Sequence, residues 1–183
     1  MSMSLFIENY YRDIARSLRK LSISPEVAAA KKILIEAYRA KPKRKVFLIG
    51  NGGSWSTASH IANDLSSAGF AASALDSVPL LSALANDYGY DQVFALQLDR
   101  LAIPEDVLIA ISVSGTSKNI MAAINLARSY RMKVIAVTGA YRPDIQADAY
   151  IYLFDENCLT AETLHLAVLH EVAYDVERIV SDG

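Results

Sequence analysis

Two pairs of ionisable side chains are spaced so that each pair can act together on a helix. His60 and Asp64 are four residues apart, which places them on one helix face. Glu162 and His170 are eight residues apart, about 80° around a helix axis, so they can converge on one site two turns deep. His165 is about 140° from His170 and is expected to point elsewhere. A carboxylate and an imidazole both exchange protons near neutral pH, so these pairs suit general acid–base chemistry.

Each histidine taken alone is explained more simply as a packed or surface residue of an amphipathic helix. The spacing also leaves open whether the two helices meet.

Two segments rich in glycine and serine are candidates for binding a phosphate group. Residues 50–54 (GNGGS) and 112–117 (SVSGTS) each follow an apolar run and open a helical pattern. The free N–H groups at a helix start attract anions, and serine hydroxyls add donors without fixed charge. Neither segment matches a P-loop or a dinucleotide-binding fingerprint. Each alone is equally an ordinary strand–helix turn, but two in one small chain favour a phosphate site.

The composition restricts the class of protein. The chain has 183 residues, 52% of them apolar, which fits one domain with a sizeable core. A net charge of −2 and a pI near 5.9 give no reason to expect nucleic acid or an anionic membrane as a partner. The lone Cys158 cannot form an internal disulfide, and the sequence has neither a signal peptide nor an apolar run long enough to span a bilayer. We therefore expect a soluble cytoplasmic protein.

Hydrophobic periodicity predicts the elements that must position these residues. Residues 1–40 carry two helical patterns, the second beginning at Ser24-Pro25 and continuing to about Arg39. Short apolar runs typical of parallel strands follow at 45–49, 71–75, 107–112, 133–138 and 150–154. Helical patterns alternate with them at 54–68, 80–101 (broken near 88–90), 118–130 and 160–180. This alternation predicts a doubly wound parallel α/β sheet. We expect a single domain over 1–183, with N-terminal helices at 1–40 and an α/β core at 43–183.

The motifs together resemble those of phosphoheptose isomerases in the sugar isomerase (SIS) domain family. Residues 50–65 resemble the pattern GNGGS-x5-H-x3-E-L, and residues 86–90 resemble N-D-x-G-[FY]. Residues 112–117 resemble STSGNS, and residues 136–139 resemble the strand end L-T-G. The last helix resembles the pattern Q-x2-H-x4-H through Glu162, His165 and His170. The resemblance covers nearly the whole chain.

The resemblance implies a five-stranded parallel sheet flanked by helices, assembled as a homotetramer with sites between subunits. It implies interconversion of sedoheptulose 7-phosphate and D-glycero-D-manno-heptose 7-phosphate through an enediol, with Asp64 and His170 as the acid–base pair. The substrate-binding positions it implies are Asn51, Gly52, Gly53, Ser54, Asn86, Asp87, Ser112, Val113, Ser114, Ser117 and Glu162. Some relatives bind zinc, and the positions that match their ligands are His60, Asp64, Glu162 and His170. All four side-chain types are acceptable zinc ligands.

Three departures from the family pattern affect this transfer. Asp64 replaces a Glu and is one methylene shorter, Glu162 replaces a Gln, and Val113 and Thr116 replace Thr and Asn. The substrate can therefore differ from the family's heptulose phosphate. Two alternatives stay open: an isomerase of another ketose phosphate, and a non-catalytic SIS protein of the kind that binds the replication initiator DnaA. The acid–base pair favours an enzyme.

Overall fold

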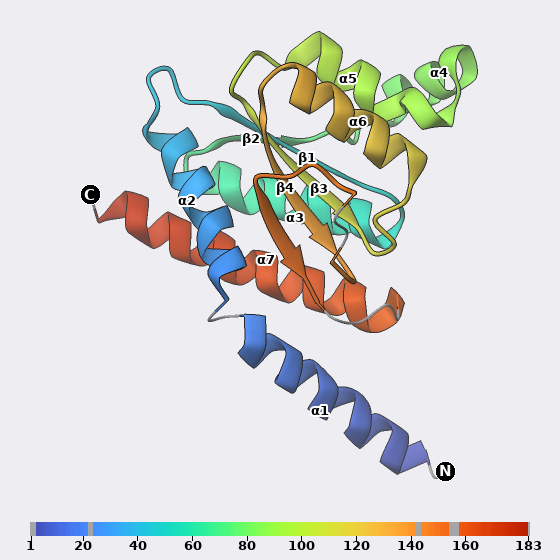
Figure 1. Cartoon of the computed structure of the whole chain (residues 1–183), viewed down its shortest axis with the longest axis vertical. Coiled ribbons are helices and arrows are strands. Elements are labelled where there is room, and N and C mark those ends of the chain that lie inside the picture. The colour runs from blue at the N-terminus through green and yellow to red at the C-terminus, as the bar shows by residue number, and fades with distance from the viewer. Residues whose placement is uncertain (1–2, 22–23, 142–143, 154–157, 183) are drawn as a thin grey trace.

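The computed structural model describes residues 3–21, 24–141, 144–153 and 158–182 (Figure 1). Its strands are β1 (Lys45–Gly50), β2 (Ala71–Ala74), β3 (Val107–Ser112), β4 (Lys133–Thr138) and β5 (Ala149–Tyr152). Its helices are α1 (Met3–Leu21), α2 (Pro25–Arg39), α3 (Gly53–Ser67), α4 (Val78–Tyr88), the 3-10 turn η1 (Tyr90–Gln92), α5 (Val93–Leu101), α6 (Lys118–Ser129) and α7 (Cys158–Ser181). The expected strands and helices are therefore confirmed to within a few residues at their ends.

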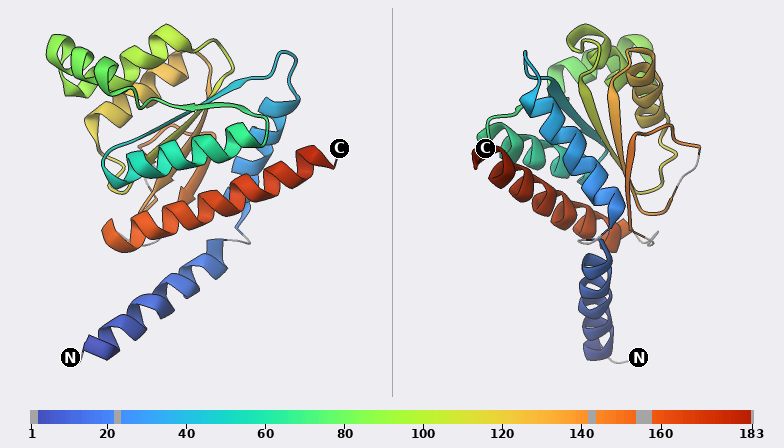
Figure 2. Two further views of the ribbon diagram at one scale, coloured as in Figure 1. Left: turned by 180° about the vertical axis from the view of Figure 1, so that it is seen from behind. Right: turned by 60° about the vertical axis from the view of Figure 1, so that its left-hand side comes forward.

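The five strands form one parallel sheet in the order β2-β1-β3-β4-β5. Helices cover both faces: α2, α3 and α7 pack on one side, and α4, α5 and α6 on the other (Figures 1 and 2). The central strand β3 is buried along its whole length, which explains its continuous run of apolar residues. The predicted doubly wound sheet is confirmed.

The strand order places β1 and β3 side by side although the chain leaves them in opposite directions. Such a switch point opens a crevice beyond the carboxyl ends of the two strands, where ligands bind in this class of sheet. Both glycine- and serine-rich segments lie there, because one follows β1 and the other follows β3.

The N-terminal helix α1 extends away from the sheet and its layers, and it contacts α7 (Figure 2). The next helix, α2, begins as predicted at Ser24, whose side chain accepts a hydrogen bond from the N–H of Val27 at 3.2 Å. Its Lys31 reaches Asp175 of α7 at 2.6 Å and also bonds Glu171. Burial opposes the charge of Lys31, but these two carboxylates raise the pKa of its amine, so the ion pairs fix α2 against α7.

Candidate functional site

The loop after β1 needs glycine for geometric reasons. Gly52 has φ of +55°, a conformation that other residues rarely adopt. Gly53 begins α3, and a Cβ there would meet the Glu162 carboxylate of α7 at 2.4 Å. Glu162 therefore packs directly against the N-terminus of α3, where the helix dipole favours a negative charge.

The loop after β3 is organised by its own hydroxyl groups. The Ser112 hydroxyl accepts a hydrogen bond from the N–H of Gly115 at 3.2 Å and lies 3.4 Å from the Ser117 hydroxyl. The Ser114 hydroxyl accepts from the N–H of Thr116 at 3.2 Å. These bonds fold the loop into a tight turn directly before α6, whose first N–H groups have no acceptor within the helix and can bind an anion.

A cavity of about 180 Å³ lies between the two loops. Its lining residues are Asn51, Ser54, Ile111, Ser112, Val113, Ser114, Ser117 and Glu162. Seven of the eleven predicted substrate-binding residues line it. A cavity lined by hydroxyl and amide groups between the starts of two helices can bind an oxyanion.

Asn51 joins a hydrogen-bonded network that the sequence motifs do not indicate. Its side-chain amide pairs reciprocally with that of Asn119 on α6, at 3.0 and 2.8 Å, and its Oδ1 also accepts a bond from the Tyr90 hydroxyl at 2.9 Å. Asn119 is 3% exposed. Nothing in the sequence marks Asn119 as its partner, because its burial and its pairing with Asn51 depend on the tertiary structure.

Asn86 and Asp87 lie at the end of α4, outside the lining of this cavity. Both are exposed, and the Asn86 amide donates to the Asp87 carboxylate at 2.9 Å. Tyr90 of the same segment links them to the glycine loop through Asn51. Their predicted contact with sugar hydroxyl groups stays a prediction.

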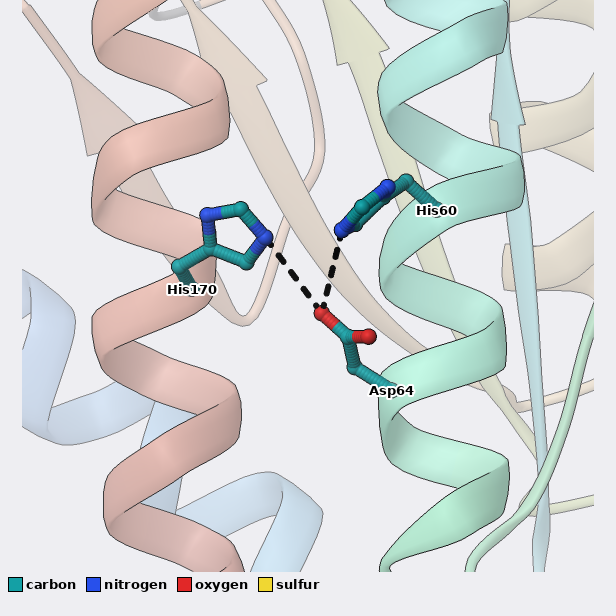
Figure 3. Close-up of side chains that lie close together, drawn as sticks. All are labelled: His60, Asp64 and His170. Atoms are coloured by element: carbon teal, nitrogen blue, oxygen red, sulfur yellow. Dashed lines mark ion pairs between the residues drawn. The ribbon is translucent and has the colours of Figure 1, made fainter.

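The helices α3 and α7 lie side by side and bring His60, Asp64 and His170 together (Figure 3). The Asp64 Oδ2 lies 3.6 Å from the Nε2 of His60 and 3.4 Å from the Nε2 of His170. The two imidazole rings meet edge to face at 4.9 Å between centroids. All three side chains are partly exposed, so a ligand can reach them. The sequence left the meeting of these helices open, and the structure settles it.

These three residues have the chemistry and spacing of a metal site. Their ligand atoms lie within 4.8 Å of one another. Ligands about 2.1 Å from a tetrahedral zinc ion are about 3.4 Å apart, close to the two distances measured at Asp64. Three protein ligands leave a fourth position open, as in catalytic rather than structural zinc sites.

Glu162 does not join this cluster within one chain, so its predicted role as a metal ligand stays a prediction. Eight residues span about 12 Å of helix axis, and the side chains follow that separation. The Glu162 carboxylate lies at Gly53 and lines the cavity of the phosphate loop, whereas His170 faces Asp64 two turns further along. The two residues therefore lie within about 80° of each other around α7, but the distance along the helix keeps their side chains apart within one chain.

His165 points into the core, as expected from its angle. It is 1% exposed, and burial lowers the pKa of its imidazole to about 4. Neither ring nitrogen has a hydrogen-bond partner among the described residues, although the backbone of Thr138 lies near enough to oppose the pKa shift in part. His165 is therefore neutral at pH 7 and plays no part in proton transfer at the exposed cluster.

A second cavity, of about 340 Å³, adjoins the histidine cluster. Its lining residues are Asp64, Ser67, His170, Ala173, Tyr174 and Glu177. Tyr174 is 59% exposed, so an apolar ring stands at the edge of the acid–base cluster. The phosphate-type cavity and this one lie at different points along α3.

Comparison with known proteins decides the family. The model of the SIS domain family matches residues 9–139. The chain belongs to the SIS domain family. Within the SIS family, a phosphoheptose isomerase from Akkermansia muciniphila is 31% identical over 99% of this chain and 100% of its own length. One from Buchnera aphidicola is 42% identical over 115 residues, 60% of this chain and 59% of that relative.

A solved structure agrees with these sequence matches. The phosphoheptose isomerase of Neisseria gonorrhoeae superposes with a TM-score of 0.88 at 25% identity, over 97% of this chain and all of that one. This SIS protein is therefore an isomerase of the phosphoheptose isomerase group, as the motifs predicted. Among the described residues, no helix has the length and apolarity to cross a bilayer.

Proposed function

We propose that the protein interconverts sedoheptulose 7-phosphate and D-glycero-D-manno-heptose 7-phosphate. The observation that carries this proposal is that the Asp64 carboxylate lies 3.4 Å from the His170 imidazole. Asp64 belongs to α3, the helix that begins at the phosphate-type cavity. The names of the matched relatives support the substrate. Aldose–ketose isomerisation needs a base and an acid of this kind.

In this proposal the phosphate end of the substrate binds in the first cavity and its carbonyl end lies near the second. The loop at Ser112–Ser117 and the start of α6 would hold the phosphate, which is an acceptor of hydrogen bonds. Ser54 and Asp64 are ten residues apart on α3, about 15 Å along its axis. An open-chain sugar with phosphate at one end and the carbonyl near the other suits that separation better than a closed ring does.

Asp64 and His170 would then move the protons. The Asp64 carboxylate removes a proton from C1 of the ketose while His170 donates a proton to the carbonyl oxygen at C2, which gives an enediol. Asp64 then returns its proton to C2, and the hydroxyl at C1 gives its proton to His170 as the new carbonyl forms. The protein ends as it began, so the step is balanced and reversible.

We also propose that His60, Asp64 and His170 hold a divalent metal ion, with zinc the best match to two imidazoles and a carboxylate. A metal there would take the place of the proton on His170, because an imidazole nitrogen that binds a metal cannot donate a proton, and it would supply the positive charge that polarises the substrate carbonyl. Glu162 can be a fourth ligand only if it comes from a second copy of the chain, because its own carboxylate lies at Gly53. Elemental analysis of protein purified without chelator tests the metal.

We propose a homotetramer with active sites at the boundaries between subunits. Support comes from exposed apolar side chains on the two helices beside the cluster: Ile7 and Tyr11 of α1 and Tyr174 and Ile179 of α7 are 43–66% exposed. Tyr174 borders the cavity that contains Asp64 and His170, so a partner covering this surface would enclose the acid–base pair. A cytoplasmic location stays a prediction from the lone cysteine and the substrate.

The test is an isomerase assay on heptulose, hexulose and pentulose phosphates, with and without zinc. We expect turnover of sedoheptulose 7-phosphate, lowered at least about 10²-fold in Asp64→Asn and in His170→Gln. Both variants should keep the circular dichroism and assembly of the wild type, because neither changes side-chain volume much. Turnover of only a shorter ketose phosphate would move the proposal to that substrate. Inactivity on all three classes would contradict it and favour the binding protein.

A further inference from the structure

Asn119 lies beneath the phosphate-type cavity, and neither the sequence motifs nor the family resemblance gives it a role. It follows Lys118 at the start of α6, and it is almost completely buried, with 3% of its surface exposed. Its amide forms two hydrogen bonds with that of Asn51, which lines the cavity from the glycine loop. The pair therefore ties the loop after β1 to the helix after β3 at the switch point.

The direction of every hydrogen bond in this network follows from one backbone group. The N–H of Ile120 donates to the Asn119 Oδ1 at 3.0 Å, so that atom is an acceptor and the amide of Asn119 cannot be flipped. The same Oδ1 then accepts from the Asn51 Nδ2, and the Asn119 Nδ2 must donate to the Asn51 Oδ1. A backbone N–H, which cannot reverse, thus fixes both side-chain amides.

The direction of the hydrogen bond from Tyr90 is fixed in the same way. Because the Asn51 Oδ1 is an acceptor, the Tyr90 hydroxyl 2.9 Å away must donate to it. The two lone pairs of that oxygen are then filled, one by Asn119 and one by Tyr90. Among the described residues the Asn51 Nδ2 has one hydrogen-bond acceptor, Asn119, so its second N–H is available to a ligand in the cavity that Asn51 lines. Asn51 can meet a ligand only as a donor.

We propose that Asn119 is a positioning residue of the sugar-phosphate site, which orients Asn51 to donate a hydrogen bond to a phosphate oxygen of the bound substrate. The proposal rests on the proposed function, since it assumes that the cavity takes a sugar phosphate. A phosphate dianion only accepts hydrogen bonds, so a donor of fixed direction selects it over groups that donate. Without Asn119, Asn51 would be free to turn its oxygen toward that negative charge.

Tyr90 completes the arrangement in this chain. The matching position in the family pattern takes either Phe or Tyr, so its hydroxyl adds to the orientation of Asn51 without being required for it. Through that bond, the segment with Asn86 and Asp87 is held against the glycine loop. Loss of the hydroxyl should therefore have a smaller effect than loss of the Asn119 amide.

The test separates binding from turnover. In Asn119→Ala we expect the KM for sedoheptulose 7-phosphate to rise about tenfold with kcat within about threefold of the wild type, because a donor to the phosphate end acts on ground and transition states alike. In Tyr90→Phe we expect a rise of about threefold. A merely structural role would instead lower stability or kcat and leave the KM in place.

Binding is also measured without catalysis, by titration with sorbitol 6-phosphate, which has no carbonyl to isomerise. Trp55, the single tryptophan, lies in the first turn of α3 and reports binding by fluorescence. The Kd should rise by the same factors as the KM. This titration decides the inference even if the wild type proves inactive on every ketose phosphate, which would contradict the proposed function alone.

Two matched variants are the controls. Asn125→Ala removes an exposed amide from the same helix, and Tyr88→Phe removes a hydroxyl that is 60% exposed two residues before Tyr90. Both should leave KM and Kd unchanged. The inference is overturned if Asn119→Ala binds sorbitol 6-phosphate as tightly as Asn125→Ala, or if the wild type does not bind it. If Asn119→Ala does not fold, the comparison of Tyr90→Phe with Tyr88→Phe is used instead. Equal Kd values for these two variants would also overturn the inference.

Discussion

At the scale of single residues, the Asp64 carboxylate has room around it. Its oxygen lies 3.4 and 3.6 Å from the two histidines, longer than a charge-assisted hydrogen bond, and a cavity of about 340 Å³ adjoins it. The family pattern has a Glu at this position. The site therefore accommodates Asp64, but its geometry does not require a side chain this short.

We accordingly predict that Asp64→Glu keeps or raises kcat for sedoheptulose 7-phosphate, because the added methylene brings the carboxylate closer to the substrate carbon. Asp64→Asn, with the same length as Asp but no basic oxygen, is the matched control and should be almost inactive. Steady-state kinetics at saturating substrate measures both. A tenfold or larger fall in Asp64→Glu would mean that the site is built around the shorter acid.

Other features of individual residues were beyond prediction from spacing. The pairing of Asp64 with His170 required knowing that α3 and α7 are neighbours, which depends on the packing of the whole layer. Asn119 could not be found, because nothing in a lone Asn at a helix start indicates that its partner is 68 residues away. The location of the Glu162 carboxylate at Gly53 was not predictable either, since the spacing of Glu162 and His170 on α7 does not show which residues of α3 each one meets.

At the scale of elements, α7 has two faces with opposite roles. One exposes His170 to the site, and the other buries His165 in the core between α7 and the sheet. The pKa of His165 falls from 6.5 to about 4 because burial disfavours the charged ring. Below pH 6.5 the unfolded chain binds a proton that the folded chain does not, so stability falls as the pH drops from 6.5 to 4.

This gives a prediction for the pH dependence of folding. The shift of the His165 pKa corresponds to about 3 kcal/mol of unfolding free energy lost between pH 7 and pH 4. In His165→Leu that loss should shrink by about the same amount, since the variant has no imidazole to protonate. Urea unfolding at the two pH values and one protein concentration measures it. An equal loss in both proteins would show that other groups control the acid sensitivity.

The elements themselves were largely predictable, for local reasons. Continuous apolar runs marked the buried parallel strands, and Ser24-Pro25 marked the start of α2. The break predicted near 88–90 is where α4 ends and η1 begins, at Gly89 with φ of +87°. The end of β5 was less well predicted, because Leu153 continues its apolar pattern beyond the last paired residue, Tyr152, and the predicted last residue, Phe154, lies outside the described residues. The division into residues 1–40 and 43–183 as parts of one domain stays a prediction.

At the scale of the whole molecule, the acid–base cluster and Glu162 are separated within one chain. The acid–base cluster lies on the outer surface of α3 and α7, bordered by exposed apolar groups such as Tyr174. Glu162 stands about 12 Å away along α7. If the subunits pack through these helices, one chain's cluster can meet a second chain's Glu162. A metal site with four protein ligands would then also be an active site shared by two subunits.

Mixing two inactive variants tests this hypothesis directly. We predict that Asp64→Asn and Glu162→Ala are each inactive as pure proteins, and that unfolding and refolding them together restores activity. For equal, random mixing across a two-fold interface, one site in each mixed pair has both native residues, so recovery should approach about a quarter of the wild-type rate. As a control, mixing Asp64→Asn with His170→Gln should restore nothing, because those residues belong to the same chain's cluster. Recovery in neither mixture would mean that each chain's cluster works without the second chain's Glu162, and light scattering on the same samples would show whether mixed assemblies had formed.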